Sequence, residues 1–426
     1  MKSGETPKSY YAATARPLPA FAPLLGAADC DVCVVGAGIA GCSAALHLAE
    51  RGYRVILLEA QRIGWGASGR SGGQALPGYS VDQGKLAALV GPQTARELWD
   101  ITVEGLDLIR DLIRRHSINC DWVDGQMHVA VKLRQRRELL AARDELVGDY
   151  GYDSVRMVEG DELRSLIASP RYVAGLFDSR SGHLHPLNYT LGLAAAARKL
   201  GVVIHEGSAA LRYQDGSPAV VHTAHGQVRC QHLVLCGNVY IDGLAPQLGR
   251  TIMGVGTYVV ATEPLGEARA TALLPNNMAV ADLNWIIDYF RRSADHRLLF
   301  GGRVSYSGLD PAATSGLTRQ RMVRVFPQLR DVAIEYSWGG HLDITLNRAP
   351  HFGRLAPNVY FLQGFSGHGI VLTGIAGKLI ASAVAGTAER FDLFTRIPHH
   401  SFPGGMLFRR PALVLAMLYY RLRDLL

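Results

Sequence analysis

Residues 31–59 of the chain read DVCVVGAGIAGCSAALHLAERGYRVILLE. The run 32–35 is apolar and largely β-branched, which predicts a short buried strand, and a glycine-rich turn follows it at 36–41. Good helix formers fill 43–51, and the stretch 53–59 predicts a second strand. The segment therefore predicts a β-α-β unit, and with it a fold of the α/β class.

The turn GAGIAG at 36–41 has the spacing of a dinucleotide-binding fingerprint. Gly36 permits the tight turn, Gly38 lets the backbone approach a pyrophosphate, and Gly41 allows close packing of helix on strand. The helix N-terminus then offers free N–H groups and its positive dipole end to the phosphates. Glu59 lies 18 residues after Gly41 and can accept hydrogen bonds from the ribose of an adenosine. Together these features predict a dinucleotide cofactor.

The next segment bears on which dinucleotide is bound. Residues 62–74 read RIGWGASGRSGGQ, with five glycines in the eleven residues from Gly64. An NAD domain would normally continue into another helix, whereas a glycine-rich loop suits a chain that wraps a larger cofactor and lines its ring system. The loop therefore favours FAD. An NAD(P)-linked dehydrogenase, in which the same loop is a flexible surface feature, remains the alternative.

Composition supports a folded chain with one unusual feature. Hydrophobic residues are 48% and charged residues 19% of the 426 residues, which is enough for a sizeable core. Glycine is 47 of 426 residues, about 11% against a usual ~7%, and no collagen-like period explains it. Much of this surplus lies at 36–41, 64–78, 301–302, 339–340 and 364–377. We expect these segments to approach the cofactor or to lie at its flavin end.

Other features exclude several classes of protein. The formal charge is +7, but the basic residues are dispersed and do not interleave with aromatics, so neither nucleic-acid binding nor a tRNA- or lipid-binding flavoprotein is favoured. The pair Cys30 and Cys33 has no partner pair at metal-ligand spacing, so we predict buried strand residues and no metal. No secretory signal and no membrane-spanning run is apparent, which predicts a cytoplasmic protein.

Four further motifs carry a resemblance to a known family. They are SYYAA (9–13), GASGRSGGQ (66–74), SGHLHPLNY (181–189) and QGFSGHG (363–369). With the fingerprint, they resemble the D-amino-acid-oxidase-like FAD enzymes, and among them those that oxidise γ-glutamylputrescine or L-pipecolate. The resemblance implies an FAD-binding Rossmann-like domain assembled from discontinuous segments, and an α+β substrate domain whose mixed sheet covers the isoalloxazine ring.

The resemblance also implies domain boundaries. The FAD-binding domain would comprise 1–85, 175–250 and 335–395, and the substrate domain 86–174 and 251–334. Residues 396–426 would form a tail, in which 408–426 predict an apolar helix with basic flanks. That helix either lies at a membrane surface on the inner face or docks on the body of the protein or on a dimer mate.

The residues expected to bind FAD follow from the same resemblance. They are Gly36, Ala37, Gly38, Ile39, Ala40, Gly41, Glu59, Ala60, Ser68, Arg70, Ser71, Gly72, Gly73, Gln74, Ala210, Gly237, Gly367, His368, Gly369 and Ile370. The stretch WGGH at 338–341 lacks the cysteine that attaches flavin covalently in sarcosine oxidase, so we expect FAD to be bound non-covalently.

The implied chemistry is oxidation of an amine or amino acid. A hydride leaves the carbon that bears nitrogen for flavin N5, and the resulting imine is hydrolysed. Electrons then pass to O₂ or, from a membrane-associated enzyme, to a quinone. Lysine catabolism (L-pipecolate) and polyamine catabolism (γ-glutamylputrescine) are both open.

The substrate side is less defined by sequence. Val371 stands where sarcosine oxidase has a carboxylate-binding lysine, so another cation is needed for a substrate carboxylate. The candidate catalytic residues are His368, Arg303, His341 and Tyr289. The candidate substrate-binding residues are Tyr258, Trp285, Arg291 and Arg348. Each has a structural alternative: a salt bridge for an arginine, the core for an aromatic, and a helix cap for His368.

Overall fold

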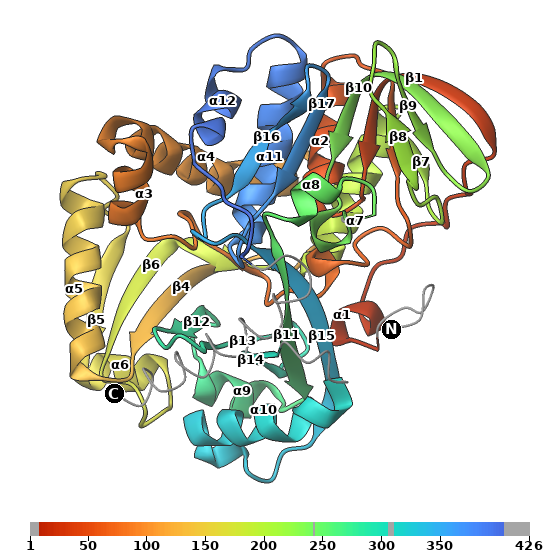
Figure 1. Ribbon diagram of the computed structural model, residues 1–426. Helices are drawn as coiled ribbons and strands as arrows, with labels where there is room; N and C mark the ends of the chain where they lie inside the picture. The colour runs from red at the N-terminus through yellow and green to blue at the C-terminus, as the bar shows by residue number, and fades with distance from the viewer. Residues whose placement is uncertain (1–7, 242, 306–310, 404–426) are drawn as a thin grey trace.

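The computed structural model describes residues 8–241, 243–305 and 311–403, and the side chains of 303–314 are left out of the description. The chain forms two large sheets, with helices packed on each (Figure 1). The predicted C-terminal helix at 408–426 lies outside the described residues.

The first sheet is built around the fingerprint strand. Its order is β16 (His351–Ala356), β17 (Val359–Gln363), β10 (Gly226–Leu235), β1 (Gly26–Val35), β2 (Val55–Leu58) and β7 (Val203–His205), and β9 (Ala219–His222) and β8 (Arg212–Gln214) extend it from β10. Strand β1 is parallel to both β2 and β10. The chain runs from β1 to β2 on one side and returns to β10 on the other, so a topological switch point lies at the end of β1.

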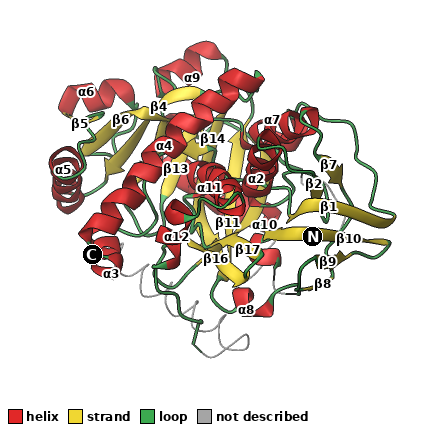
Figure 2. Cartoon of the chain, turned by 90° about the horizontal axis from the view of Figure 1, so that it is seen from above, coloured by secondary structure: helices red, strands yellow, loops and turns green. Residues whose placement is uncertain are grey.

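Four helices cover one face of this sheet (Figure 2). They are α2 (Ile39–Glu50), α4 (Pro92–His116), α7 (Pro186–Lys199) and α11 (Gly369–Val384). Helices α2 and α11 pack closely because Gly377 has no side chain: a Cβ there would lie 2.5 Å from the Ala44 backbone nitrogen. The Ser43 hydroxyl also donates to the Gly374 carbonyl at 2.6 Å. The apolar core of this half lies between these helices and the sheet.

The second sheet is mixed and curved over the first. Its order is β15 (Ile334–Ile344), β11 (Met253–Thr262), β14 (Leu298–Ser305), β13 (Asp288–Arg292), β12 (Ala279–Asp282), β4 (Val123–Ala130), β6 (Ala174–His183) and β3 (Gln74–Ala75), with β5 (Val155–Glu159) paired to β6. Its flanking helices are α5 (Leu133–Gly148), α6 (Gly160–Leu166), α9 (Glu267–Leu273) and α10 (Pro311–Val325). Stacked Phe290 and Phe300 rings, 5.9 Å apart, lie at the centre of its own core.

Short elements complete the described chain. They are α1 (Tyr10–Ala13), α3 (Gln83–Val90), α8 (Pro246–Gly249), α12 (Glu389–Thr395) and the 3₁₀ turns Ala67–Gly69, Asn238–Tyr240 and Pro327–Leu329. Helix α1 is the SYYAA motif, and it ties the N-terminal segment to the second sheet. Both tyrosines are buried there, and Tyr11 packs edge-on against Trp338 at 5.2 Å.

The mixed α/β fold and the predicted local elements are confirmed. The predicted β-α-β unit is formed by β1, α2 and β2. The domain boundaries remain a prediction, but strand pairing differs from them at three places. Strands β3, β6 and β15 were assigned to the FAD-binding part, yet β3 pairs with β6, β6 along β4 and β15 along β11, all in the second sheet.

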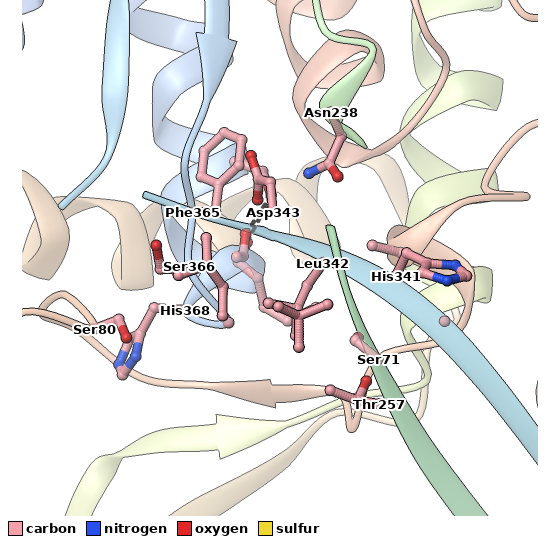
Figure 3. Close-up of a pocket in the computed structure, with 18 of the residues that line it drawn as sticks. Ser71, Ser80, Asn238, Thr257, His341, Leu342, Asp343, Phe365, Ser366 and His368 are labelled. Carbon is pink, nitrogen blue, oxygen red and sulfur yellow. Dashed lines mark hydrogen bonds between the residues drawn. The ribbon is translucent and has the colours of Figure 1, made fainter. Parts of the chain in front are cut away.

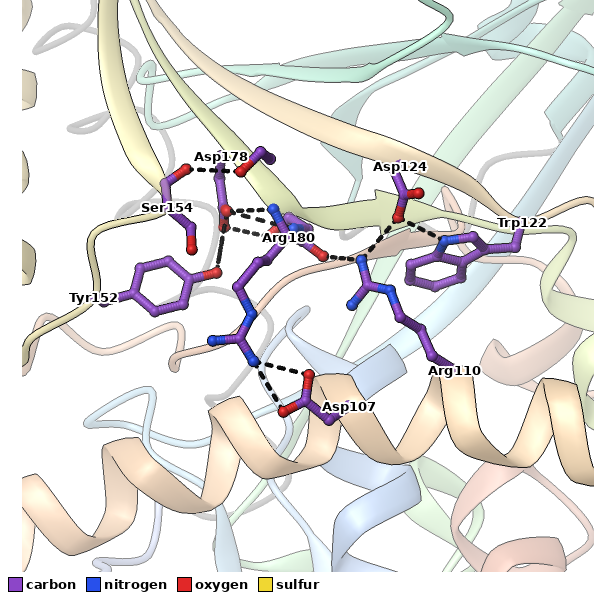
Figure 4. Close-up of polar contacts among 10 residues, drawn as sticks. Asp107, Arg110, Trp122, Asp124, Tyr152, Ser154, Asp178 and Arg180 are labelled. Carbon is purple, nitrogen blue, oxygen red and sulfur yellow. Dashed lines mark hydrogen bonds and ion pairs between the residues drawn. The ribbon is translucent and has the colours of Figure 1, made fainter.

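A polar network joins α4 to the second sheet (Figure 4). The buried Asp178 carboxylate accepts hydrogen bonds from the Tyr152 hydroxyl at 3.0 Å, from the Ser181 hydroxyl and from the Arg180 backbone nitrogen at 3.0 Å. The Arg180 guanidinium then reaches α4, where it donates to both carboxylate oxygens of Asp107 at 2.8 Å. The buried half of this network satisfies groups that cannot reach water, whereas Asp107 is 59% exposed.

Among the described residues, no single helix is long and apolar enough to span a bilayer. The bent pair α11 and α12 meets the length and composition test only when taken together, at an angle of 117°.

The histidines of the SGHLHPLNY motif have structural roles. His185 is the N-cap of α7: its Nδ1 accepts a hydrogen bond from the Asn188 backbone nitrogen at 3.1 Å. Its Nε2 lies 3.1 Å from the Thr14 hydroxyl oxygen. Burial, together with the positive charge of Arg291, lowers the pKa of His185 to about 3. Protonation of Nδ1 would break the N-cap bond, so the folded protein holds this histidine neutral.

We expect His185→Asn to reduce the sensitivity of the fold to acid. The unfolded chain binds a proton at this histidine below about pH 6.5, and the folded chain does so only near pH 3, so stability falls as the pH drops between these values. At pH 5 this loss amounts to about 2 kcal/mol. Asparagine keeps the N-cap acceptor and does not titrate. The free energy of unfolding is measured with urea at pH 7 and at pH 5. Between these pH values it should fall by about 2 kcal/mol more in wild type than in the variant. The exposed His225→Asn is the matched control, and an equal change in both variants would contradict the prediction.

Candidate active site

A cavity of about 1620 Å³ lies between the two sheets, at the carboxyl ends of β1 and β10. One end is formed by the fingerprint and the end of β2, and the other by α3 and the start of α5. Residues of both sheets and of the α11 N-terminus line its middle, as Figure 3 shows for part of the wall. The switch point of the first sheet therefore opens into this cavity.

The fingerprint glycines have distinct roles. Gly36 has a φ of +101°, and a Cβ there would lie 2.7 Å from the Cys236 carbonyl oxygen. A Cβ on Gly41 would lie 1.9 Å from the Gly36 carbonyl oxygen, so this glycine allows α2 to pack on the turn. Gly38 differs from both: its Cβ would meet only the Ser68 hydroxyl, at 2.8 Å, and it lines the cavity. That hydroxyl accepts a hydrogen bond from the Ile39 backbone nitrogen at the start of α2.

Glu59 is held rigidly at the end of β2. One carboxylate oxygen accepts from the Ala37 backbone nitrogen at 2.7 Å, and the other from the Gln61 backbone nitrogen at 2.8 Å. Burial raises the pKa of Glu59, and the two backbone donors oppose that rise. The carboxylate lines the cavity beside Ala210, as the expected adenosine end requires.

The cavity wall fits an elongated dinucleotide at two further points. The Ser71 hydroxyl is buried without a protein partner and faces the cavity (Figure 3), so it has a hydrogen bond to offer a bound group. Arg70 is held in place by the chain: its Nε donates to the Trp65 carbonyl at 2.7 Å, and its guanidinium lies 4.3 Å from the centre of the Trp65 ring. The residues present therefore fit an elongated dinucleotide such as FAD.

The QGFSGHG motif forms the predicted strand–glycine–helix step. Gly364 and Gly367 have φ of +78° and +93°, and α11 begins with His368 as its N-cap. The turn is fixed by Asp343, whose carboxylate accepts from the Gly364 backbone nitrogen and whose carbonyl accepts from the Ser366 backbone nitrogen at 3.0 Å. Burial raises the pKa of Asp343.

The sequence analysis missed Asp343 and its neighbour Asn238, which both line the cavity (Figure 3). A bond from the Asn238 amide helps to hold the Asp343 carboxylate charged. The available signal was an acid between the apolar residues Leu342 and Ile344, at the end of a strand.

Side chains that are neutral at neutral pH line the part of the cavity near the N-terminus of α11. Burial lowers the pKa of His368 to about 4, the nearby His128 adds to that lowering, and a bond to the Pro77 backbone opposes it. Burial also lowers the pKa of His128, which projects from β4 and was not predicted. Tyr289 lies over two glycines: a Cβ would lie 2.6 Å from its ring at Gly72 and 2.0 Å at Gly301. Burial raises the pKa of this tyrosine, so its hydroxyl stays protonated at neutral pH.

The structure places most predicted site residues on the cavity. Those that line it are Gly36, Gly38, Ile39, Ala40, Glu59, Ala60, Ser68, Arg70, Ser71, Gly72, Gly73, Gln74, Ala210, Gly237, Trp285, Tyr289, His341, Arg348, Gly367, His368, Gly369 and Ile370. His341 is partly exposed, and burial with the nearby charge of Arg70 lowers its pKa.

Other predicted residues do not line the cavity. Ala37 and Gly41 belong to the fingerprint but are turned away from the cavity, and Tyr258 packs under Gly339, where a Cβ would lie 3.1 Å from its ring. The buried Arg291 guanidinium donates to the carbonyls of Gly72 and Leu184 and to the Tyr11 hydroxyl, at 2.8 to 3.0 Å. Arg291 thus joins three backbone segments, and we do not retain it as a substrate ligand.

Arg303 was predicted as a catalytic residue. Its backbone belongs to β14, but its side chain is among those not described. Over the described part of the chain, no cluster of histidine, cysteine or acidic residues could hold a metal ion. Cys30 and Cys33 are buried free cysteines of β1.

A glycine turn that opens onto a cavity between a sheet with a parallel centre and a curved mixed sheet is typical of dinucleotide-dependent oxidoreductases. Residues 31–383 match the family described as DAO, FAD dependent oxidoreductase. The chain belongs to this family and is an FAD-dependent oxidoreductase, so of the two cofactors considered, FAD is confirmed.

The chain is similar in sequence to two known proteins and in fold to one solved structure. The chain is 44% identical to gamma-glutamylputrescine oxidoreductase of Escherichia coli (strain K12) over 421 residues, 99% of each chain. It is 43% identical to the probable oxidoreductase OrdL of Haemophilus influenzae over 409 residues, 95% of this chain and 94% of the relative. Glycine oxidase from Geobacillus kaustophilus superposes with a TM-score of 0.74 at 20% identity, over 88% of this chain and 100% of that one. This last likeness shows the fold alone.

Proposed function

We propose that the chain oxidises the C–N bond of a γ-glutamylputrescine-type amine, with non-covalently bound FAD as the hydride acceptor. The observation that carries the proposal is the 44% identity to gamma-glutamylputrescine oxidoreductase over 99% of both chains. Of the two substrates that the sequence left open, this similarity supports the first. None of the relatives described above is named for L-pipecolate.

Several residues have assigned roles in this proposal. Gly36 and Gly38 bring the backbone against the cofactor pyrophosphate, Glu59 binds its ribose, and Ser71 donates to it nearer the ring. When bound, FAD supplies the acceptor for the hydride that leaves the carbon next to the substrate nitrogen. Tyr289 and the α11 N-terminus shape the space in which that carbon is held.

The substrate amine must lose a proton before the hydride leaves, because its nitrogen lone pair assists that step. His128 and His368 are both neutral at neutral pH and line the same part of the cavity, so they add no charge there, and a ring nitrogen of either can hydrogen-bond to the neutral amine once its proton has gone to solvent. The products are then the imine, which water converts to an aldehyde and ammonia, and a reduced cofactor.

The state of the cysteine that lines the cavity supports non-covalent binding of FAD. Cys236 lines the cavity, but it lies beside the fingerprint, and burial raises the pKa of its thiol to about 12. It therefore remains a protonated thiol, which is a poor nucleophile. Denaturation in acid should release all flavin into the supernatant.

Anaerobic titration of the purified protein tests the function. We expect yellow protein whose oxidised-flavin bands bleach within the mixing time on addition of γ-glutamylputrescine, and far more slowly with L-pipecolate or putrescine. Folded protein that neither carries nor takes up FAD would contradict the proposal, as would faster bleaching by L-pipecolate. Readmission of air then tests the electron acceptor: rapid return of colour with peroxide formation indicates O₂, and return only with an added quinone indicates a quinone.

The location and assembly of the protein remain expectations. We propose a cytoplasmic enzyme that acts alone or as a homodimer, with the 408–426 segment as the candidate contact to a membrane surface. Cell fractionation with and without that segment, and light scattering of the purified chain, distinguish these states.

A further inference from the structure

The end of the cavity farthest from the fingerprint is lined by charged side chains. Lys132, Arg134 and Glu138 come from the start of α5, and Asp82 and Lys85 from the start of α3. Figure 1 shows α3 and α5 together on one flank of the molecule, and β1 with its fingerprint on the other. A cofactor bound along the fingerprint would leave this charged end to the substrate.

The start of α5 is fixed to the loop that carries Trp285. The Gln135 side chain is buried, and its carbonyl oxygen accepts from the backbone nitrogens of Val131 at 2.7 Å and Lys132 at 3.1 Å. Its amide nitrogen donates to the Asn284 side-chain oxygen at 3.1 Å. The charged residues of α5 and Trp285 thus keep a fixed position relative to one another.

Arg134 and Glu138 form an ion pair within this wall. The Arg134 Nε and Glu138 Oε1 atoms lie 3.5 Å apart, one helical turn from each other, and the side chains are 49% and 54% exposed. An ion pair at this exposure contributes little to stability, so a ligand can take over either partner at low cost. Neighbouring positive and negative groups are what the carboxylate and ammonium of an amino-acid head group require.

Apolar side chains also line the cavity. Leu89, Trp285 and Ile287 are among them and are 38%, 45% and 42% exposed. Leu89 belongs to α3, and Trp285 follows Asn284, which is bonded to α5, so both lie near the charged end. Exposed apolar side chains of this kind suit the four-carbon chain of a diamine. The cavity therefore combines a charged mouth with apolar side chains beside it and with two neutral histidines.

We propose that the mouth is a binding site for the amino-acid head group of a γ-glutamylated amine. Lys132 and Arg134 bind its α-carboxylate, Glu138 binds its α-ammonium, and the apolar side chains hold the chain that leads the reacting amine inward. This site deepens the proposed function and rests on it. It would make the enzyme selective for γ-glutamylated amines over free diamines.

The test compares glutamine substitutions inside and outside the cavity. We expect Lys132→Gln with Arg134→Gln to raise KM for γ-glutamylputrescine about ten-fold, which corresponds to about 1.4 kcal/mol, with kcat nearly unchanged. Putrescine lacks the head group, so its kcat/KM should change less than two-fold. Arg137→Gln is the control for Arg134→Gln alone, because it removes one positive charge from an exposed position of the same helix that does not line the cavity.

A non-reacting ligand isolates binding from chemistry. γ-Glutamyl-butylamide carries the head group and chain but no terminal amine, and its inhibition constant should rise with KM in the double variant only. If wild type oxidises γ-glutamylputrescine and the double variant keeps its KM, or if Arg137→Gln has an equal effect, the head-group site is overturned while the function stands. If wild type oxidises no γ-glutamylated amine, both fall.

Discussion

Replacement of Gly38 by alanine is expected to give a folded protein that binds FAD at least about 100-fold more weakly, a loss of about 2.7 kcal/mol. The added methyl group would meet only the Ser68 hydroxyl, which can rotate away, so the fold can accept it. That rotation removes the acceptor of the Ile39 backbone nitrogen, and the methyl group occupies the cavity wall where the pyrophosphate would approach. Titration of the apoprotein with FAD, followed by quenching of flavin fluorescence, measures the change.

The same methyl group at Gly41 should have a different consequence. It would lie 1.9 Å from the Gly36 carbonyl oxygen, and neither backbone can move without displacing α2 from the sheet. We therefore expect Gly41→Ala to lower the free energy of unfolding of the apoprotein by several kcal/mol, whereas Gly38→Ala changes it by less than about 1 kcal/mol. Gly148→Ala, which adds a methyl group in open space, is the control for both. Tight FAD binding by Gly38→Ala would show that this glycine does not face the cofactor.

Replacement of Asp178 by alanine is expected to lower the free energy of unfolding by about 2–4 kcal/mol. The loss leaves the hydroxyls of Tyr152 and Ser181 buried without their acceptor, and water cannot reach them. Urea unfolding followed by far-ultraviolet circular dichroism measures the effect.

Asp107 provides the control for this prediction. Its carboxylate belongs to the same network but is 59% exposed, so Asp107→Ala should cost no more than about 1 kcal/mol. An equal loss in the two variants would mean that the ion pair to Arg180, and not the burial of Asp178, joins α4 to the second sheet. The FAD affinity of both variants should stay close to that of wild type, because neither residue lines the cavity.

The β-α-β unit at the centre of the first sheet was predictable because its determinants are local. The fingerprint, the helix after it and Glu59 are contiguous, and their packing follows from steric limits on three glycines. The second sheet was predicted only by resemblance, since its strands come from distant segments. Strands β6 and β15 each border a fingerprint-side element in sequence but pair with a strand far from it, so their sheet could not be inferred from their order along the chain.

Site residues were predictable where the backbone conformation or a close approach requires glycine. They were less predictable where the site needs a charged or titratable side chain. Gly38 could be named from the fingerprint spacing and Gly72 from the resemblance, whereas His128 and Asp343 occupy ordinary strand positions whose surroundings only the fold reveals. Arg291 shows the opposite case. An arginine near the site invites assignment to a ligand, but burial forces its donors onto backbone carbonyls.

The glycine surplus also has a more varied basis than predicted. Gly38 lines the cavity, as expected, but a Cβ on Gly69 would lie 2.2 Å from the Gly64 carbonyl oxygen, and one on Gly73 would lie 2.2 Å from that of Leu184. These glycines let the loop pack against the chain itself. The loop that lines the cofactor is thus compact and is not a flexible surface feature.

Two tryptophans lie where their fluorescence should report whether the cofactor and the substrate are bound. Of the five tryptophans in the chain, Trp65 lines the cavity next to the fingerprint and Trp285 lines its mouth. Indole emission is quenched by nearby flavin through energy transfer, so loading of the cofactor should be seen through Trp65. Entry of a substrate should then alter the emission of the partly exposed Trp285. A single unlabelled sample can therefore follow the order in which cofactor and substrate bind.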